Sequence, residues 1–386
     1  MSWRCSTAVL VAAFTIGCGG DDNTAVVGGS TSLSLVTFNA AQLAELAQYP
    51  EQRLAATERD LPRLGADVVC LQELWDVGAL DGVADALVGT FPYSHRSVQA
   101  TGGVGGADCT ESEATSLAEC LSDNCGDEEG SALALCAVQN CADEFMSVSP
   151  ACQQCIASNQ SSGSLDELTS VCAAGEGATY SDQTGLLLLS RLPLEDTDYL
   201  ALPSALGDRG VLSARVQTQF AGTVDLFCTH LAATLDLEYT GAFDSWEGER
   251  AEQIELLLQY SAERSSGARA VLGDLNCGPV TDDARGAGAE AFARFTDDDF
   301  AAPYVEGDGR CTWCSDNPLT GFSDDGADVG AILDHVLVSE FPPVTSEPER
   351  IFDDRIRVDV DGDTVETVRS DHYGVQVTLS VEQAAP

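Results

Sequence analysis

Eight short apolar runs constrain the fold of this 386-residue chain most strongly. Each run holds four to eight residues, is rich in Val, Leu and Phe, and is bounded by Gly, Asp or Pro, as buried β-strands are. Segments with helical periodicity lie between the runs, at Glu51–Leu64 and Glu249–Ser261. Strands that alternate with helices predict a layered α/β domain with helices packed on sheet faces. The runs are Leu33–Phe38, Asp67–Leu71, Leu186–Ser190, Val211–Val216, Val224–Thr229, Ala270–Gly273, Ile332–Ser339 and Gly374–Leu379.

Residues 101–182 break this alternation. They begin with a Gly-rich segment and contain eight cysteines, several of which recur at intervals close to sixteen residues. Segments rich in Ala and Leu separate the cysteines, so we predict short helices that are stapled by disulfides and inserted between two strands of the main domain. The sequence leaves open both the disulfide pairing and the role of the insert, which could be a structural cap or an interaction module. The eight are Cys109, Cys120, Cys125, Cys136, Cys141, Cys152, Cys155 and Cys172.

Four cysteines outside residues 101–182 are interpreted separately. Cys70 and Cys228 lie within apolar strand patterns and are predicted to be small core residues. Cys311 and Cys314 are separated by two residues, a spacing that suits either a local disulfide or half of a metal site. Because no second Cys or His pair lies nearby, the spacing favours the disulfide.

The N-terminus carries an export signal. The apolar stretch Ala8–Ile16 is too short to span a bilayer, which takes about 20 residues, and residues 1–17 therefore read as a signal peptide. The ending Thr15-Ile16-Gly17-Cys18 resembles a bacterial lipobox, in which Cys18 would be lipidated and residues 18–30 would form a flexible tether. An ordinary signal peptide with a chance cysteine is the alternative. We expect an exported lipoprotein, anchored at the periplasmic or outer cell surface.

The charge of the chain excludes some chemistry. All 18 basic residues are arginines against 63 acidic residues, which gives a net charge of -45. The lack of lysine removes Schiff-base catalysis and a P-loop lysine. Tight binding of a nucleic-acid backbone needs clustered positive charge, so the charge disfavours it, although a nuclease that contacts its substrate through metal ions stays open.

Residues with metal-binding or acid–base side chains follow or flank six of the predicted strands. In an open sheet such residues usually gather into one site, because the ends of neighbouring strands meet at the same edge. One polar strand end is unremarkable, whereas six with complementary chemistry indicate a catalytic site. The residues are Asn39, Gln72-Glu73, His230, Asp274-Leu275-Asn276, Asp334 and Asp371-His372.

These motifs resemble, in order, those of the endonuclease/exonuclease/phosphatase superfamily, over residues 31–380 apart from the insert. The resemblance implies a four-layer α/β sandwich of two stacked mixed sheets flanked by helices, spanning 31–386 and interrupted by 101–182. The segments Thr184–Leu194 and Thr229–Ala233 are similar to the neutral-sphingomyelinase branch, although DNase-like members share much of this pattern.

The resemblance implies a divalent cation, with Mg²⁺ expected and Mn²⁺ or Ca²⁺ as alternatives. Glu73 would bind it, helped by Asn39 and Asp371, because oxygen ligands suit a hard cation. Such a cation polarises a phosphoryl oxygen and stabilises the leaving alkoxide.

The same resemblance assigns proton transfer. His372 would be the general base, and Asp334 would fix its tautomer and stabilise the imidazolium. Asp274 and Asn276 would orient water and a phosphoryl oxygen. His230 would donate to a non-bridging oxygen or to the leaving group.

Three functions follow as hypotheses. The first is an Mg²⁺-dependent phosphodiesterase of the sphingomyelinase C type, monomeric and acting on a phospholipid. The second is an extracellular DNase-like endonuclease, and the third is a non-catalytic surface module that binds a partner through the insert. The anionic surface favours lipid headgroups over polyanionic substrates.

Four further residues have roles that the motifs do not assign. Arg209 could contact a substrate phosphate or form a surface salt bridge. We expect His335 and His95 to be structural and Trp313 to pack beneath the site.

Overall fold

The computed structural model describes most of the chain after residue 30. The predicted signal peptide and tether lie outside the described residues, and no helix among those described is long and apolar enough to cross a membrane. The described residues are 31–42, 47–75, 77–97, 99–100, 109–126, 136, 140–149, 152–153, 172, 180–181, 184–235, 239, 241–265, 267–320, 330–360 and 362–381.

The first of two large sheets has six strands in the order β12-β15-β1-β2-β6-β3. β1 and β2 pair in parallel and the other neighbours pair antiparallel, so the sheet is mixed. The strands are β1 (Ser32–Asn39), β2 (Val68–Gln72), β3 (Tyr93–His95), β6 (Leu187–Ser190), β12 (Val344–Ile351) and β15 (Gly374–Val381).

The second large sheet has five strands in the order β11-β10-β9-β8-β7. β9 and β10 are parallel, and the remaining pairs are antiparallel. The strands are β7 (Glu195–Leu202), β8 (Arg209–Thr218), β9 (Gly222–His230), β10 (Ala268–Asp274) and β11 (Asp334–Ser339).

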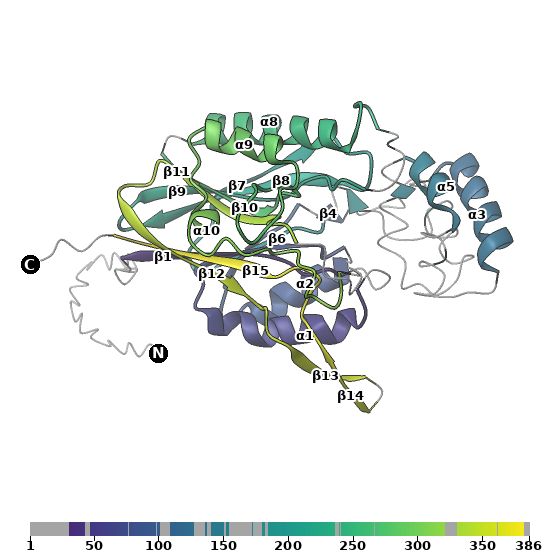
Figure 1. Ribbon diagram of the computed structural model, residues 1–386, viewed down its shortest axis with the longest axis horizontal. Helices are drawn as coiled ribbons and strands as arrows, with labels where there is room; N and C mark the ends of the chain where they lie inside the picture. Colours follow the sequence, from purple (N-terminus) through teal and green to yellow (C-terminus); the bar gives the residue numbers. More distant parts are fainter. Residues whose placement is uncertain are drawn as a thin grey trace, which may run out of the picture.

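The two sheets are stacked, with helices on their outer faces (Figure 1). Neighbouring residues of one strand serve different layers: Leu35 belongs to the core between the sheets, whereas Val36 packs in the cluster beneath the helices of the first sheet. This double burial explains why the strands read as nearly continuous apolar runs. The predicted four-layer sandwich is confirmed. The helices are α1 (Pro50–Asp60) and α2 (Val77–Leu87) on the first sheet, and α8 (Trp246–Arg264) and α9 (Ala289–Asp297) on the second.

A disulfide joins the two sheets. Cys70 of β2 and Cys228 of β9 are bonded, with their Cα atoms 5.5 Å apart. Both cysteines lie in the core, as predicted, but the sequence did not indicate that they pair. The stacking of the sheets brings two buried strands face to face at this point. Cys311 and Cys314 form the expected local disulfide.

The described part of the insert contains helices held by disulfides, as predicted. The helices are α3 (Glu111–Cys125) and α5 (Ala142–Ser147). Thr110 caps α3 through a reciprocal pair of hydrogen bonds with Glu113. Short strands β4 (Gln99–Ala100) and β5 (Tyr180–Ser181) pair at its base. The disulfides join Cys109 to Cys152, Cys120 to Cys141, and Cys125 to Cys136.

Several elements lacked an apolar run and were not predicted. β7 and β12 are edge strands with largely exposed side chains, so no buried pattern marks them. The ribbon of β13 (Ile356–Val360) and β14 (Asp363–Thr367) extends from the body, and its inner side packs on Ala56 of α1. The described residues also form the short helix α10 (Pro303–Glu306) and a 3-10 turn at Leu61–Leu64.

Candidate active site

The polar strand ends of both sheets meet at one edge of the sandwich. Asp274 at the end of β10 is paired in register with His230 of β9 and with Asp334 of β11. Asn39, at the end of β1 in the other sheet, donates from Nδ2 to Asp274 Oδ2 at 3.0 Å. The predicted residues of the two sheets therefore form one buried cluster. The close approach of β9 and β10 requires a glycine at Gly273, because a Cβ atom there would lie 2.1 Å from the carbonyl oxygen of Thr229.

His372 and Asp334 form a buried pair. His372 Nδ1 lies 2.8 Å from Asp334 Oδ2, and the side chain of Asp334 is fully buried. The hydroxyl of Thr312 accepts hydrogen bonds from the backbone amides of Leu333 and Asp334, which fixes the start of β11. Burial of the ring opposes protonation, but the carboxylates of Asp334 and Asp274 outweigh it and hold the pKa of His372 well above its usual range. The ring therefore carries a proton at neutral pH unless the carboxylate charge is offset.

Asp274 lies at the centre of the cluster. Besides the bond from Asn39, it accepts a hydrogen bond from the backbone amide of Asn276 at 2.9 Å. Its Oδ2 is 3.6 Å from His230 Nε2 and 3.7 Å from His372 Nδ1. Burial, above the other influences, raises the pKa of Asp274 to about 7. A buried carboxyl group between two imidazole rings is suited to share charge with a cation or a proton.

Glu73 enters the cluster from the end of β2. Its backbone is left-handed, with φ of 59°, a conformation that is uncommon for a non-glycine residue and concentrates at functional sites. Its Oε1 accepts a hydrogen bond from Asn39 at 3.0 Å. Burial and the charge of Asp371 raise the pKa of Glu73. Asp371 is itself half-buried and accepts a hydrogen bond from Ser370.

We call the carboxyl groups of Glu73, Asp274 and Asp334 the acidic cluster. The ring of His230 faces this cluster with Nε2 and faces Arg209 with Nδ1. Arg209 Nη1 lies 3.3 Å from His230 Nδ1, and since a guanidinium can only donate, Nδ1 accepts and Nε2 carries the hydrogen. Nε2 is 3.9 Å from Glu73 Oε1. Burial and the charge of Arg209 lower the pKa of His230 well below its usual value, so the ring is neutral. This geometry leaves Nε2 free to donate toward the cluster, and the predicted donation to a phosphoryl oxygen stays a prediction.

Arg209 is not at the surface. It is 8% exposed and its guanidinium lies over the ring of Trp75, 5.2 Å from the centroid. Of the two alternatives for Arg209, the surface salt bridge was wrong, because the start of β8 lies beside the end of β9 rather than on an outer edge. Contact with a substrate phosphate stays a prediction. The sequence held no signal for its contact with His230.

Asn39 and Asn276 are held in ways that the sequence did not indicate. Asn39 Oδ1 accepts a hydrogen bond from the amide of Ala41, so its nitrogen bridges Glu73 and Asp274. A ligand role for its oxygen stays a prediction. Asn276 has left-handed backbone, with φ of 48°, and donates from Nδ2 to the carbonyl of Leu231. Its predicted contact with a phosphoryl oxygen also stays a prediction.

Arg53 supports the site and was missed by the sequence analysis. It is fully buried in α1 and donates to the backbone carbonyls of five residues. One of them belongs to Arg369, which directly precedes Ser370-Asp371-His372, and others lie in the segment after β1. Burial lowers the pKa of Arg53 to about 10, and the charges of Asp371 and Glu73 oppose that shift. Arg53 thereby ties the loops that carry Asn39 and His372 to one helix.

The side chains of the remaining histidines and of Trp313 make contacts outside the cluster. His335 Nε2 is 2.9 Å from the carbonyl oxygen of Cys277, and its buried ring packs 4.7 Å from that of Phe292. His95 Nε2 lies 2.9 Å from the carbonyl oxygen of Asp198. The backbone of Trp313 pairs with that of His372. None of these three is one of the side chains that meet in the acidic cluster.

The donor set of this cluster fits a divalent cation. Donor atoms of Asp274, Asp334 and His372 lie within 4.8 Å of one another, and Glu73 adjoins them through Asn39. Asp334 Oδ1 is buried without a hydrogen-bond partner, which is costly for a carboxylate oxygen unless a cation or water meets it. Hard oxygen donors of this kind suit Mg²⁺ or a related ion.

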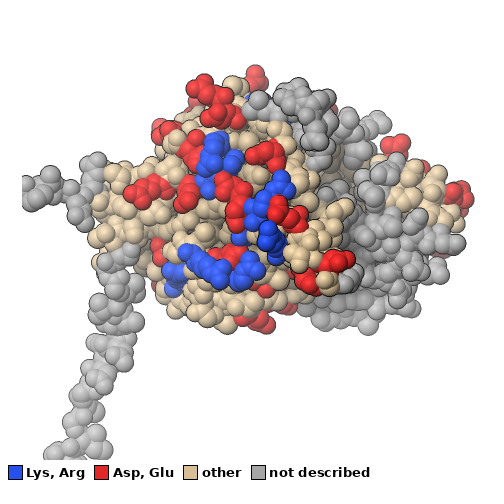
Figure 2. Space-filling view, turned by 60° about the horizontal axis from the view of Figure 1, so that its bottom comes forward, with Lys and Arg blue, Asp and Glu red and all other residues tan. Residues whose placement is uncertain are grey.

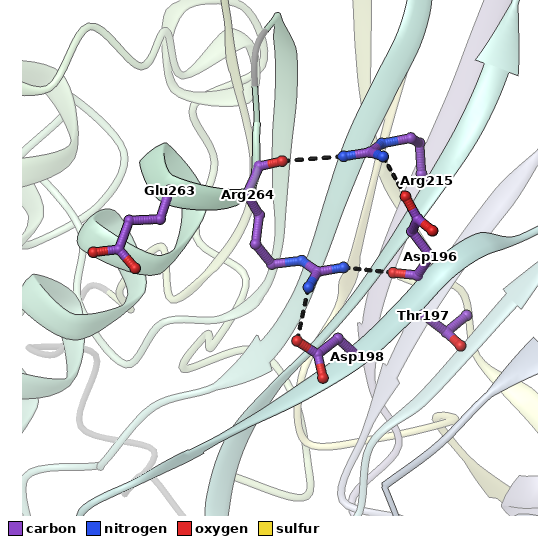
Figure 3. A pocket seen from close by; sticks show the side chains of 6 residues that line it. All are labelled: Asp196, Thr197, Asp198, Arg215, Glu263 and Arg264. Atoms are coloured by element: carbon purple, nitrogen blue, oxygen red, sulfur yellow. Dashed lines mark hydrogen bonds and ion pairs between the residues drawn. The ribbon is translucent and has the colours of Figure 1, made fainter.

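A separate polar recess lies toward the other end of the second sheet (Figure 3). Arg215 is paired with Asp196 and Asp225, and Arg264 donates to Asp198 at 2.7 Å. Both guanidinium groups are thus already engaged by carboxylates. The recess is a network of ion pairs at the surface and contains none of the predicted site residues.

Comparison with known proteins identifies the family. The sequence model of the Endonuclease/Exonuclease/phosphatase family matches residues 36–372, which include every residue of the cluster. The chain belongs to this family. Its membership supports phosphoester hydrolysis as the general activity. A search of curated protein sequences found no match.

Several solved structures share the fold. SmcL is 16% identical, with a TM-score of 0.55 over 91% of this chain and 99% of that one. Sphingomyelinase C from Streptomyces griseocarneus is 16% identical, with a TM-score of 0.54 over 90% and 99%. A beta toxin variant from Staphylococcus aureus with bound magnesium ions is 14% identical, with a TM-score of 0.54 over 91% and 100%. These similarities establish the fold, whereas the substrate belongs to the proposal below.

Proposed function

We propose that this protein is a divalent-metal-dependent phosphodiesterase that hydrolyses the phosphodiester bond between a phospholipid and its headgroup. Sphingomyelin is the first substrate to test. The observation that carries the proposal is the buried cluster in which Asp334 engages His372 Nδ1 at 2.8 Å while His230 Nε2 faces Asp274 at 3.6 Å. Such a cluster provides a base, a hydrogen-bond donor and cation ligands within one site. The similarity to sphingomyelinase C supports the choice of substrate.

The residues of the cluster would have different roles in hydrolysis. Glu73, Asp274 and Asp371 would hold the cation, which when bound offsets their charge, polarises a phosphoryl oxygen and stabilises the leaving oxygen. His372 takes the proton of the attacking water at Nε2, since Asp334 occupies Nδ1 and stabilises the imidazolium. His230 donates from Nε2 to a phosphoryl oxygen, because Arg209 keeps Nδ1 as an acceptor.

The charge of the protein favours a zwitterionic headgroup over a polyanion. The formal net charge is -45, and the face in Figure 2 shows arginines interleaved with acidic side chains rather than a wholly basic surface. Arg59, Arg63 and Arg369, for example, all contact Asp60. A long nucleic acid would meet repulsion over most of such a surface, whereas a single headgroup needs only the site itself.

We also propose that the protein is exported and anchored to a membrane. The candidate lipidation site at Cys18 would hold the enzyme on the outer side of a bacterial membrane, close to lipid. The disulfides among the described residues support an oxidising environment, because such bonds are rare in reducing compartments. Mass spectrometry of the membrane fraction tests the anchor: a diacylated N-terminal Cys18 is expected, and a soluble chain with an unmodified N-terminus would contradict it.

A substrate panel tests the proposed activity. Purified protein should release phosphocholine from sphingomyelin vesicles with Mg²⁺ and should lose this activity in EDTA. Phosphatidylcholine vesicles and plasmid DNA serve as competing substrates, and His335→Gln, outside the cluster, serves as the histidine control for His372→Gln. Plasmid nicking without lipid hydrolysis would replace the proposal with the endonuclease alternative.

A further inference from the structure

The cysteine-rich insert is docked on the main domain by an apolar contact. Met146 of α5 is 4% exposed and shares one buried cluster with Ala205 and Trp246, which are 7% and 5% exposed. The partly buried side chains of Phe145 and Leu206 pack against the same cluster. A module that hung from a linker would leave Met146 in water. The insert therefore has a built interface with the segment between β7 and β8.

A buried amide adds a polar contact at the same interface. Gln153 is 1% exposed, and its Nε2 donates to the carbonyl of Val148 within the insert at 3.1 Å. Its Oε1 accepts the backbone amide of Gly207 in the main domain at 3.0 Å. Because a buried amide without partners is costly, this side chain favours the docked arrangement over a detached one.

The segment that receives these contacts is residues 203–208, within which the hydroxyl of Ser204 bonds to the backbone of Leu206. From the side of the main domain it is held by α8, where Glu249 accepts from the amide of Ala205 and Gln253 donates to the carbonyl of Pro203. The insert holds it from the other side through Gly207. The segment is thus fixed between α8 and the insert rather than by a strand ladder.

This segment leads directly into Arg209. Gly207, whose amide the insert binds, lies two residues before Arg209, whose guanidinium contacts His230 Nδ1 at 3.3 Å. Arg209 also pairs with Leu202 of β7, so the segment is a loop closed by this pair, and a shift of the loop would be passed to Arg209 and to its contact with His230. That contact keeps the Nε2 hydrogen of His230 directed at the acidic cluster, where Asp274 Oδ2 is 3.6 Å away.

We propose that the insert is a positioning element of the active site: through Met146 and Gln153 it fixes residues 203–208, so that Arg209 holds His230 in its working orientation. The proposal rests on the proposed phosphodiesterase activity of this site. Met146 and Gln153 are positioning residues, because they act through Arg209 and lie outside the acidic cluster.

The test removes the docking contacts and compares the loss with that of Arg209. Met146→Ala combined with Gln153→Ala should lower kcat on bis-p-nitrophenyl phosphate about tenfold and change KM by less than about twofold. The conservative Met146→Leu should retain most of kcat. Leu121→Ala is the matched control and should leave kcat unchanged, because its cluster within the insert shares only the partly buried Phe145 with the docking contact.

A double-mutant cycle separates positioning from a general loss of structure. We call the combination of Met146→Ala and Gln153→Ala the docking variant. If the insert acts through Arg209, adding Arg209→Ala to the docking variant should give the same kcat as Arg209→Ala alone. Losses that simply multiply, or a docking variant with the wild-type kcat, would overturn the proposal.

Amide hydrogen exchange tests, without a measurement of activity, whether the insert fixes residues 203–208. Peptides that cover residues 203–212 should exchange faster in the docking variant, whereas peptides of β10 should not change. Unchanged exchange over 203–212 would overturn the positioning role. A wild-type protein that hydrolyses no phosphodiester would instead contradict the proposed function, and the exchange result would still stand or fall independently.

Discussion

Removal of the disulfide between Cys70 and Cys228 tests how the two sheets are held together at the active-site edge. Cys70 lies two residues before Gln72, which ends β2 next to Glu73, and Cys228 lies two residues before His230. The bond therefore fixes the two strand ends that carry a proposed cation ligand and a proposed donor. We expect the double variant Cys70→Ala/Cys228→Ala to lose stability and to separate these ends more readily.

The length of the closed loop sets the magnitude. The two cysteines are 158 residues apart, and in the chain-entropy description a loop of this length stabilises the folded state by about 5 kcal/mol. The disulfide between Cys109 and Cys152 lies inside the loop and shortens it, but the dependence on length is logarithmic and the estimate changes little. Such a loss is a large fraction of the stability of an ordinary domain, which is about 5–15 kcal/mol.

Urea unfolding followed by tryptophan fluorescence measures this loss. The matched control is Cys311→Ala/Cys314→Ala, whose cysteines are only three residues apart and should cost about 2 kcal/mol on the same basis. A long-loop variant that loses no more free energy of unfolding than this control would refute the reasoning.

Three other perturbations have defined outcomes. Asp334→Asn should lower turnover about a hundredfold, because it removes the partner of His372, and should weaken Mg²⁺ binding less than Glu73→Gln, for which a loss of at least about tenfold is expected. Calorimetry and kinetics that show equal effects on both quantities in both variants would contradict the assigned roles. Mg²⁺ should lower the pKa of His372, because it offsets the carboxylates that raise it, and an NMR titration in which that pKa does not move would disagree. Arg59 and Arg369 hold the pKa of Asp60 down at about 2, so its contribution to stability is present above the ordinary carboxyl pKa and is lost as the pH falls toward 2. Asp60→Asn should therefore flatten the fall in unfolding free energy between about pH 4 and pH 2, and an unchanged slope would argue against the ion pair.

The core strands and the order of site residues could be predicted because burial on both faces leaves a strong local signal. The run Leu186–Ser190 is apolar up to its last residue, and its bounds differ from those of the observed strand β6 by one residue. β12 and the ribbon of β13 and β14 left no such signal, since their exposed side chains are free to be polar.

Contacts between elements distant in the chain could not be predicted. The bond from Cys70 to Cys228 depends on how two sheets stack, and neither cysteine stands out within its strand. Arg209 gives no sign in the sequence that it will be buried on His230, and Arg53 looks like an ordinary helix residue although it donates to five carbonyls. Each of these depends on the register between strands and helices, which a single sequence does not specify.

One measurement tests the central claim directly: phosphocholine release from sphingomyelin vesicles by the wild-type protein and by His372→Ala, each with Mg²⁺ and with EDTA. The wild type with Mg²⁺ should release phosphocholine, EDTA should abolish release, and His372→Ala should lower the rate by about a hundredfold or more, because a general base contributes that much. No release by the wild type with any divalent cation, or a wild-type rate in His372→Ala, would contradict the proposal that this cluster hydrolyses lipid phosphodiesters.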